Sequence, residues 1–180
     1  MCRIKKTLKH PKVDEGRRTT FREKINKYEK EGSSVVYVDE SGFAHDMPRT
    51  YGYSPVGGRC YGTQNCNAKG RKNVIAGLCG DSLIGCGIVE GNVDTAVFNT
   101  WVKKIFIPDL PENSVVIMDN AAFHKSQETK ELIENHGHKI EFLPPYSPDL
   151  NPIEHKWAQA KAIRRREDCD VVELFRDHVP

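Results

Sequence analysis

The sequence predicts an α/β fold built on a mixed sheet in one main domain. Five short runs rich in β-branched and aromatic residues are spaced along the 180 residues, as expected for strands. The first three runs follow one another with loops between them, whereas the last two alternate with helical segments. After an N-terminal helix, the expected order is therefore β-β-β-α-β-α-β-α. A chain of this length can bury a hydrophobic core of its own.

The segment 13–31 predicts the N-terminal helix. Phe21, Ile25 and Tyr28 recur at helical spacing and form one apolar stripe. Gly32 follows and ends the periodic pattern.

Charge is unevenly distributed along the chain. Residues 1–30 hold 11 Lys/Arg and 4 Asp/Glu, and the remaining 150 residues hold 16 and 21. The basic arm is either a polyanion-binding segment or a solvated, lysine-rich helix. We divide the chain into a basic linker and helix (1–32) and a main domain (33–180).

The run VVYVD at 35–39 predicts the first strand, with Asp39 at its carboxyl end. Period-two alternation places Val35, Tyr37 and Asp39 on one face of the strand and Glu40 on the other. The alternative is that Asp39 only opens a D-E-S-G turn.

Residues 41–60 are rich in glycine and proline and predict a long loop or irregular hairpin. Basic and aromatic groups interleave in it: Arg49, Tyr51, Tyr53 and Arg59. Such a set either lines a nucleic-acid groove or packs its aromatic rings on its own hairpin.

The runs 71–79 and 83–90 predict a hairpin of two strands around a Gly-Asp turn. A helix is then expected over 95–107.

We expect Val97, Trp101 and Ile105 to form the core stripe of that helix. Pro108 and Pro111 should end it.

The run VVIMD at 115–119 predicts a buried strand that, like the first, ends in an aspartate, Asp119. A helix over 126–136 and a strand over 138–143 follow.

The most informative stretch is FLPPYSPDLNPIEHKWAQAK, residues 142–161. Its prolines predict a rigid loop, and a helix begins around Pro152 with Asn151 as its N-cap. Glu154 lies in the first turn of that helix. Glu154 is either a functional acid or the third residue of a capping box that bonds back to the N-cap amide.

Three acids are thus expected near strand ends: Asp39, Asp119 and Glu154. In an open α/β sheet, ligands bind at the carboxyl ends of the strands. Carboxylates that converge there repel each other unless cations offset their charge, and hard oxygen ligands suit Mg²⁺ or Mn²⁺. Two such ions would support metal-assisted chemistry on phosphodiesters.

Spacing and motifs make this hypothesis specific. Between Asp119 and Glu154 lie 34 residues, and the three acids sit in VDESG, IMDNAAFH and PPYSPDLNPIEHKW. This pattern resembles the catalytic domain of DDE transposases of the mariner-related superfamily, most closely the bacterial insertion-sequence branch. The resemblance covers the chain from about residue 13. It implies a ribonuclease H-like mixed sheet with helices on both faces.

The resemblance also implies an activity. Asp39, Asp119 and Glu154 would bind two Mg²⁺ or Mn²⁺ ions, and the enzyme would cleave DNA at transposon ends and join the freed 3′-hydroxyl to target DNA. The implied partners are DNA and either a second copy or a helix-turn-helix DNA-binding half. Relatives carry such a region ahead of the catalytic domain, whereas MCRIKKTLKHPKVDEG looks like the linker that follows it. Because no apolar run approaches the length of a bilayer span, no membrane partner is expected.

Further residues have secondary roles in this reading. Asn120 and His124 follow Asp119 in the family pattern, and His124 either orients a phosphate or holds Asp119, or is simply packed at the start of a helix. Trp157 is expected to be a core anchor rather than a stacking platform. The candidate DNA contacts are Arg49, Lys161, Arg164, Arg165 and Arg166.

Two other functions remain open: a non-catalytic or decayed DNA-binding fragment that regulates a full-length transposase, and a sequence-independent nuclease of the same fold. The six cysteines form no C-x-x-C pair, and no signal peptide is recognised. We therefore expect reduced, mostly buried thiols in a cytoplasmic, nucleoid-associated bacterial protein.

Overall fold

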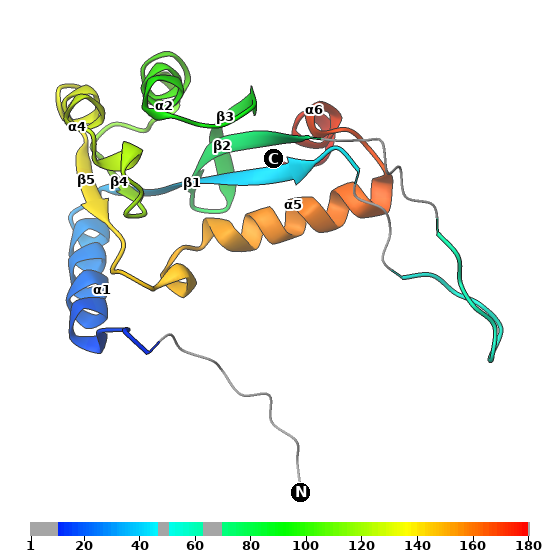
Figure 1. Ribbon diagram of the computed structural model, residues 1–180. Helices are drawn as coiled ribbons and strands as arrows, with labels where there is room; N and C mark the ends of the chain where they lie inside the picture. Colours follow the sequence, from blue (N-terminus) through cyan, green and yellow to red (C-terminus); the bar gives the residue numbers. More distant parts are fainter. Residues whose placement is uncertain (1–10, 47–50, 63–69, 180) are drawn as a thin grey trace, which may run out of the picture.

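The computed structural model describes residues 11–46, 51–62 and 70–179. Its centre is a five-stranded mixed sheet with strand order β3-β2-β1-β4-β5 (Figure 1). The strands are β1 (Ser34–Ala44), β2 (Arg71–Cys79), β3 (Ser82–Glu90), β4 (Ser114–Met118) and β5 (Lys139–Phe142). The first three strands pair antiparallel, and β4 and β5 run parallel to β1.

Helices cover both faces of this sheet, as predicted, with α2 and α4 on one face and α1 and α5 on the other (Figure 1). The main helices are α1 (Glu15–Lys30), α2 (Thr95–Trp101), α4 (Gln127–Glu134) and α5 (Ile153–Glu167). Shorter helical segments are η1 (Val102–Phe106), α3 (Ile107–Asp109), η2 (Phe123–Lys125), η3 (Pro148–Leu150), α6 (Val171–Glu173) and η4 (Leu174–His178). After α1, the principal elements follow the predicted order.

Strand β1 is longer than predicted. It continues through Phe43, which is fully buried and packs edge-on against Trp157 of α5, and its pairing with β2 extends to Ala44. Asp39 therefore lies inside the strand, which contradicts both its placement at the strand end and the turn alternative. The tertiary contact of Phe43 outweighs the turn-forming sequence Asp-Glu-Ser-Gly.

The pairing between β1 and β4 nevertheless ends just before Asp39. The last β1–β4 pair is Tyr37 with Ile117, and β4 ends at Met118. Continuing this register by two places puts Asp39 across from Asp119. The end of β4 thus brings the two aspartates to one edge of the parallel half of the sheet, which is the arrangement that matters for the site.

The helix after β3 differs from prediction in its core stripe. Ile105 is 40% exposed, and the buried apolar side chains are Phe98, Trp101, Val102 and Phe106. A π-helical stretch over Val102–Phe106 widens the helix and rotates Ile105 outward. Pro108 lies inside the final turn rather than ending the helix. The wide π turn accommodates a residue that lacks an N–H.

Helix α1 packs directly on the sheet. Phe21 and Ile25 are buried in one cluster with Val115 and Ile117 of β4, and Tyr28 packs beside them. The apolar stripe predicted from the sequence is therefore the face that α1 buries. The boundary predicted after residue 32 stays a prediction.

The aromatic side chains of the predicted glycine- and proline-rich loop are exposed. Tyr51 and Tyr53 are 92% and 104% exposed, and Figure 1 shows residues 51–62 extending away from the sheet. Their rings therefore do not pack on their own hairpin.

Of the cysteines in the described ranges, only Cys169 is buried, so the expectation of mostly buried thiols is wrong.

In the described part of the chain, no helix has both the length and the apolar composition that a bilayer span requires.

Candidate active site

A cavity of about 420 Å³ lies beside the parallel strands. All three candidate acids line it: Asp39 from β1, Asp119 from the end of β4 and Glu154 from the first turn of α5. The rest of its wall is Asn120, the proline loop from Leu143 to Pro148, and Asn151. Three acids that are far apart in the sequence therefore share one cavity.

Asp39 projects toward α5, the face that strand alternation predicts. The indole N–H of Trp157 donates to Asp39 Oδ2 over 3.3 Å. Trp157 itself is 2% exposed and packs edge-on against Phe43 and Phe175. It is thus a core anchor, as expected, and also orients a site carboxylate, a contact that the sequence does not reveal.

Trp157→Phe tests this orienting role. Phenylalanine keeps most of the aromatic packing but cannot donate to Asp39, so we expect metal-dependent activity to fall about tenfold. The matched control is Trp101→Phe, because the Trp101 indole donates to Gly85 O over 2.7 Å on the other side of the sheet. Cleavage rates of both variants, compared at equal folded fraction, check the prediction. Equal losses in the two variants would contradict it.

The cavity concentrates negative charge. Burial raises the pKa of Asp39, and the nearby charges of Glu154, Glu40 and Asp119 add to this, bringing it to about 7. A carboxyl group whose pKa is raised by burial and by like charges is disfavoured in its ionised form, and a nearby cation would offset the repulsion. The electrostatics therefore favour binding of positive charge between these acids.

Asp119 is held by a buried histidine. His124 is fully buried, its Nδ1 lies 2.7 Å from Asp119 Oδ1 and its Nε2 lies 2.9 Å from Glu40 Oε1. Burial lowers the pKa of His124, but the two carboxylates outweigh it and raise the pKa to about 9. As an imidazolium, His124 donates from both nitrogens. It therefore links β1 to the end of β4, which favours the predicted role of holding Asp119.

The same contact acts on the aspartate. The hydrogen bond from His124 is the largest cause of a lowered pKa at Asp119. Asp119 and Asp39 thus differ in protonation behaviour although they line the same cavity. Glu40, the third member of this link, is a residue that sequence reasoning missed. Alternation placed it on the opposite face from Asp39, where His124 meets it.

Glu154 is not part of a capping box. The backbone N–H of Asn151 donates to Pro148 O over 3.0 Å, so it is not available to the Glu154 carboxylate. The predicted N-cap role of Asn151 is also wrong: its Oδ1 is buried and accepts no hydrogen bond from the described residues. The η3 turn lies shortly before α5, and Pro152 rather than Asn151 is the residue that directly precedes the helix. Glu154 is exposed and lines the cavity.

The proline loop is anchored at the cavity wall. Asn120 Nδ2 donates to Leu143 O over 2.7 Å, tying the loop to the end of β4. Tyr146 has φ +57°, a left-handed conformation that bulky residues rarely adopt. Ser147 is buried and its hydroxyl donates to Pro145 O. Asn120 therefore shapes the site through the loop.

The candidate DNA contacts separate into three groups. Arg164 is only 6% exposed, and its guanidinium donates to the carbonyls of Ala44, His45 and Cys169. Its predicted DNA contact is therefore contradicted, because these contacts tie the end of β1 to α5. Lys161 Nζ lies 5.5 Å from the centre of the Phe43 ring.

Arg166 is exposed and pairs with Glu167 over 2.6 Å, and Arg165 is partly buried beside it. Their DNA contacts, like that of Lys161, remain predictions. Arg49 lies outside the described residues.

The donor set suits a hard divalent cation. Asp39, Asp119 and Glu154 supply only carboxylate oxygens, the ligands that Mg²⁺ and Mn²⁺ prefer. Among the described residues, no three His, Cys, Asp or Glu side chains come close enough to hold one ion. The acids therefore share a wall without forming a closed cluster, and their carboxylate oxygens are what fits a hard cation.

Comparisons with known proteins bear on the family and the fold. A family model described as DDE superfamily endonuclease matches residues 34–173. Among solved structures, the Mos1 strand transfer complex matches with a TM-score of 0.69 and 18% identity over 91% of this chain and 52% of that chain. The catalytic domain of Mos1 mariner transposase matches with a TM-score of 0.57 and 14% identity over 88% and 78%.

A Mos1 paired-end complex with left transposon end also matches, with a TM-score of 0.67 and 16% identity over 91% of this chain and 53% of that chain. The chain spans about half the length of the first of these structures. At these identities the likeness shows the shared fold. A comparison with curated proteins finds no match.

Proposed function

Because the chain belongs to the DDE superfamily endonucleases, we propose that it is the catalytic domain of a mariner-related transposase that cleaves DNA and transfers the cut strand. The observation that carries this proposal is the convergence of Asp39, Asp119 and Glu154 on one cavity beside the parallel strands. The predicted ribonuclease H-like fold supports it, since the Mos1 catalytic domain has the same fold.

Each acid has a distinct part in the proposed chemistry. Asp39, oriented by Trp157, and Asp119, held by His124, would bind divalent ions from two strands, and Glu154 would complete the set from α5. When bound, two such ions activate the attacking oxygen and stabilise the leaving oxygen of a phosphodiester. No side chain needs to act as a covalent nucleophile, because water and a DNA 3′-hydroxyl are the attacking groups.

The finer features are proposed with it. The ions are Mg²⁺ or Mn²⁺, and solved Mos1 paired end complexes with Mg and with Mn support this choice. The DNA partners are transposon ends and target DNA, bound by a homodimer or together with a helix-turn-helix half. Lys161, Arg165 and Arg166 on α5 are the proposed phosphate contacts within the described residues. A bacterial insertion-sequence origin and a cytoplasmic, nucleoid-associated location complete the proposal.

A cleavage assay tests the proposal. The purified chain, with and without a helix-turn-helix partner, is incubated with labelled DNA that does or does not carry transposon ends. We expect 3′-hydroxyl products with Mg²⁺ or Mn²⁺ and none with EDTA. Cleavage that ignores the ends would favour a sequence-independent nuclease. DNA binding without cleavage in either metal would favour the regulatory fragment.

A further inference from the structure

We propose that Arg18 of α1 is a positioning residue that holds the proline loop and thereby fixes the first turn of α5, which carries Glu154. The catalytic consequence depends on the function proposed above, whereas the link between helix and loop can be tested without it. Arg18 lies outside the segment that the family model matches. The inference therefore extends the site to a helix that the family match does not include.

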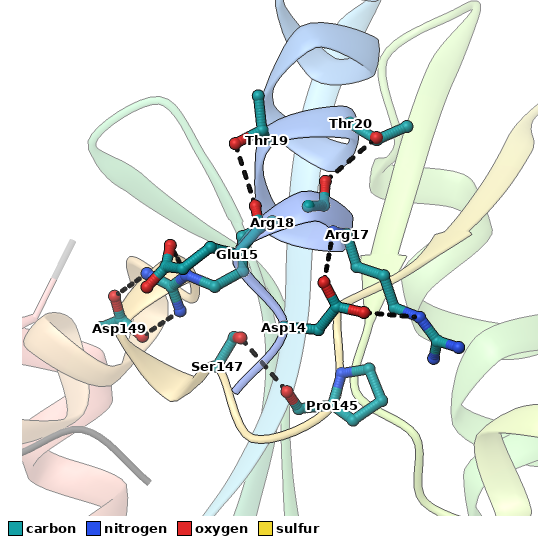
Figure 2. Close-up of polar contacts among 10 residues, drawn as sticks. Asp14, Glu15, Arg17, Arg18, Thr19, Thr20, Pro145, Ser147 and Asp149 are labelled. Carbon is teal, nitrogen blue, oxygen red and sulfur yellow. Dashed lines mark hydrogen bonds and ion pairs between the residues drawn. The ribbon is translucent and has the colours of Figure 1, made fainter. Parts of the chain in front are cut away.

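The link is a two-pronged ion pair between distant parts of the chain. Arg18 Nη1 donates to Asp149 Oδ1 over 2.9 Å, and Nη2 donates to Asp149 Oδ2 over 2.6 Å (Figure 2). Arg18 Nε lies 3.3 Å from Glu15 Oε2 on the same helix. Paired N–H···O bonds of this kind fix orientation as well as distance. The pair therefore defines where the η3 turn lies relative to α1.

The burial of the two partners is unequal. The Arg18 side chain is 5% exposed, whereas that of Asp149 is 62% exposed. The hydrogen bond from Arg18 is the largest cause of a lowered pKa at Asp149. If the pair is broken, Asp149 can be hydrated in place, so the loss should loosen the loop rather than unfold the domain. This separates positioning from global stability.

Helix α1 is held against the sheet by contacts other than the Arg18–Asp149 pair. Besides its buried stripe, α1 is attached to β5 through Glu141, which accepts from Tyr28 over 2.9 Å and pairs with Lys24 over 2.5 Å. Arg18 therefore projects from a helix that is fixed to the edge of the sheet independently of Asp149.

On the other side, the loop leads directly into the site. Asp149 lies in the η3 turn, one residue before Leu150 and two before Asn151, and α5 begins at Ile153. Residues 143–148 and Asn151 line the same cavity as Glu154. A small shift of this turn moves both the cavity wall and Glu154. Displacements of about 1 Å in a catalytic group can cost roughly a hundredfold in rate.

Hydrogen exchange of the metal-free protein tests the link directly. The amides of Leu150 and Asn151 donate within the η3 turn, to Ser147 O and Pro148 O. In Arg18→Met, which keeps the apolar stem, we expect these amides to exchange at least about tenfold faster. Arg17→Met is the matched control, because Arg17 is exposed on the same helix and pairs with Asp14 rather than with the proline loop; Figure 2 shows both pairs.

Activity then tests the positioning role. For Arg18→Met, we expect kcat to fall about tenfold while KM for DNA stays unchanged, and Arg18→Lys to lie between the variant and the wild type. Faster exchange with an unchanged kcat overturns the positioning role. Wild-type exchange in Arg18→Met overturns the link itself.

Two further outcomes distinguish the link from protein folding and from the proposed function. Should Arg18→Met fail to fold, Asp149→Ala replaces it, because it removes both acceptor oxygens at an exposed position. Faster exchange of the Leu150 and Asn151 amides there supports the link, and unchanged exchange overturns it. Should the wild-type chain not cleave DNA while the variant loop still loosens, the link stands and the proposed function fails.

Discussion

Replacing Asp39, Asp119 or Glu154 by alanine is expected to abolish metal-dependent cleavage. A divalent ion bound by these acids would supply several kcal/mol of transition-state stabilisation, which corresponds to a loss of about a thousandfold for each single variant. Because the three groups act as a unit, a double variant should be no worse than a single one. The measurement is the rate of 3′-hydroxyl product formation in saturating Mg²⁺ and in Mn²⁺.

The fold should survive the loss of the Asp39 carboxylate. Asp39 has its pKa raised to about 7 by burial and by neighbouring negative charges, so its ionised form is destabilised in the folded protein. Asp39→Asn removes that unfavourable charge and should leave the unfolding midpoint unchanged or higher in metal-free buffer. A variant that loses activity together with its fold would say nothing about metal binding. The unfolding midpoint is therefore measured alongside the cleavage rate.

A matched control comes from the β2–β3 turn. Asp81 is exposed there and does not line the cavity, so Asp81→Asn should cleave DNA at the wild-type rate. If Asp39→Ala, Asp119→Ala and Glu154→Ala all cleave like this control, the assignment of the three acids is wrong.

The family and the fold could be predicted because both depend on local patterns. The strand over VVIMD, the helix stripe of Phe21 and Ile25, and the motifs around the three acids are each encoded within a few residues. The structure confirms the mixed sheet with helices on both faces. The family match confirms the DDE superfamily that the motifs indicate, and the bacterial insertion-sequence branch stays a prediction.

What the sequence did not reveal depends on contacts between distant segments. The length of β1 is decided by Phe43 packing on Trp157, more than a hundred residues away. Arg164 is buried because its guanidinium donates to the carbonyls of Ala44 and His45 at the end of the same strand. Neither outcome has a local signature, because an arginine in the last turn of a helix has the same sequence pattern whether it faces solvent or a strand end.

His124→Ala should have the largest effect on stability. The side chain is fully buried between Asp119 and Glu40, whose side chains are 50% and 19% exposed. Removing it leaves two carboxylates without their shared cation, at a cost of about 3 kcal/mol in the free energy of unfolding. His136→Ala is the control, since His136 is exposed and its removal should cost much less. Urea unfolding in the presence of EDTA measures both.

The pH dependence of this loss follows from the pKa of His124. That pKa lies at about 9 in the folded protein, above its ordinary value of 6.5, so protonation of His124 stabilises the fold. The contribution is complete below pH 6.5 and is lost as the pH rises through about 9. The difference in unfolding free energy between wild type and His124→Ala should therefore be largest at pH 6 and shrink toward pH 10. A difference that stays constant over this range would mean that His124 is held as a neutral imidazole, and that the link between β1 and β4 is steric rather than ionic.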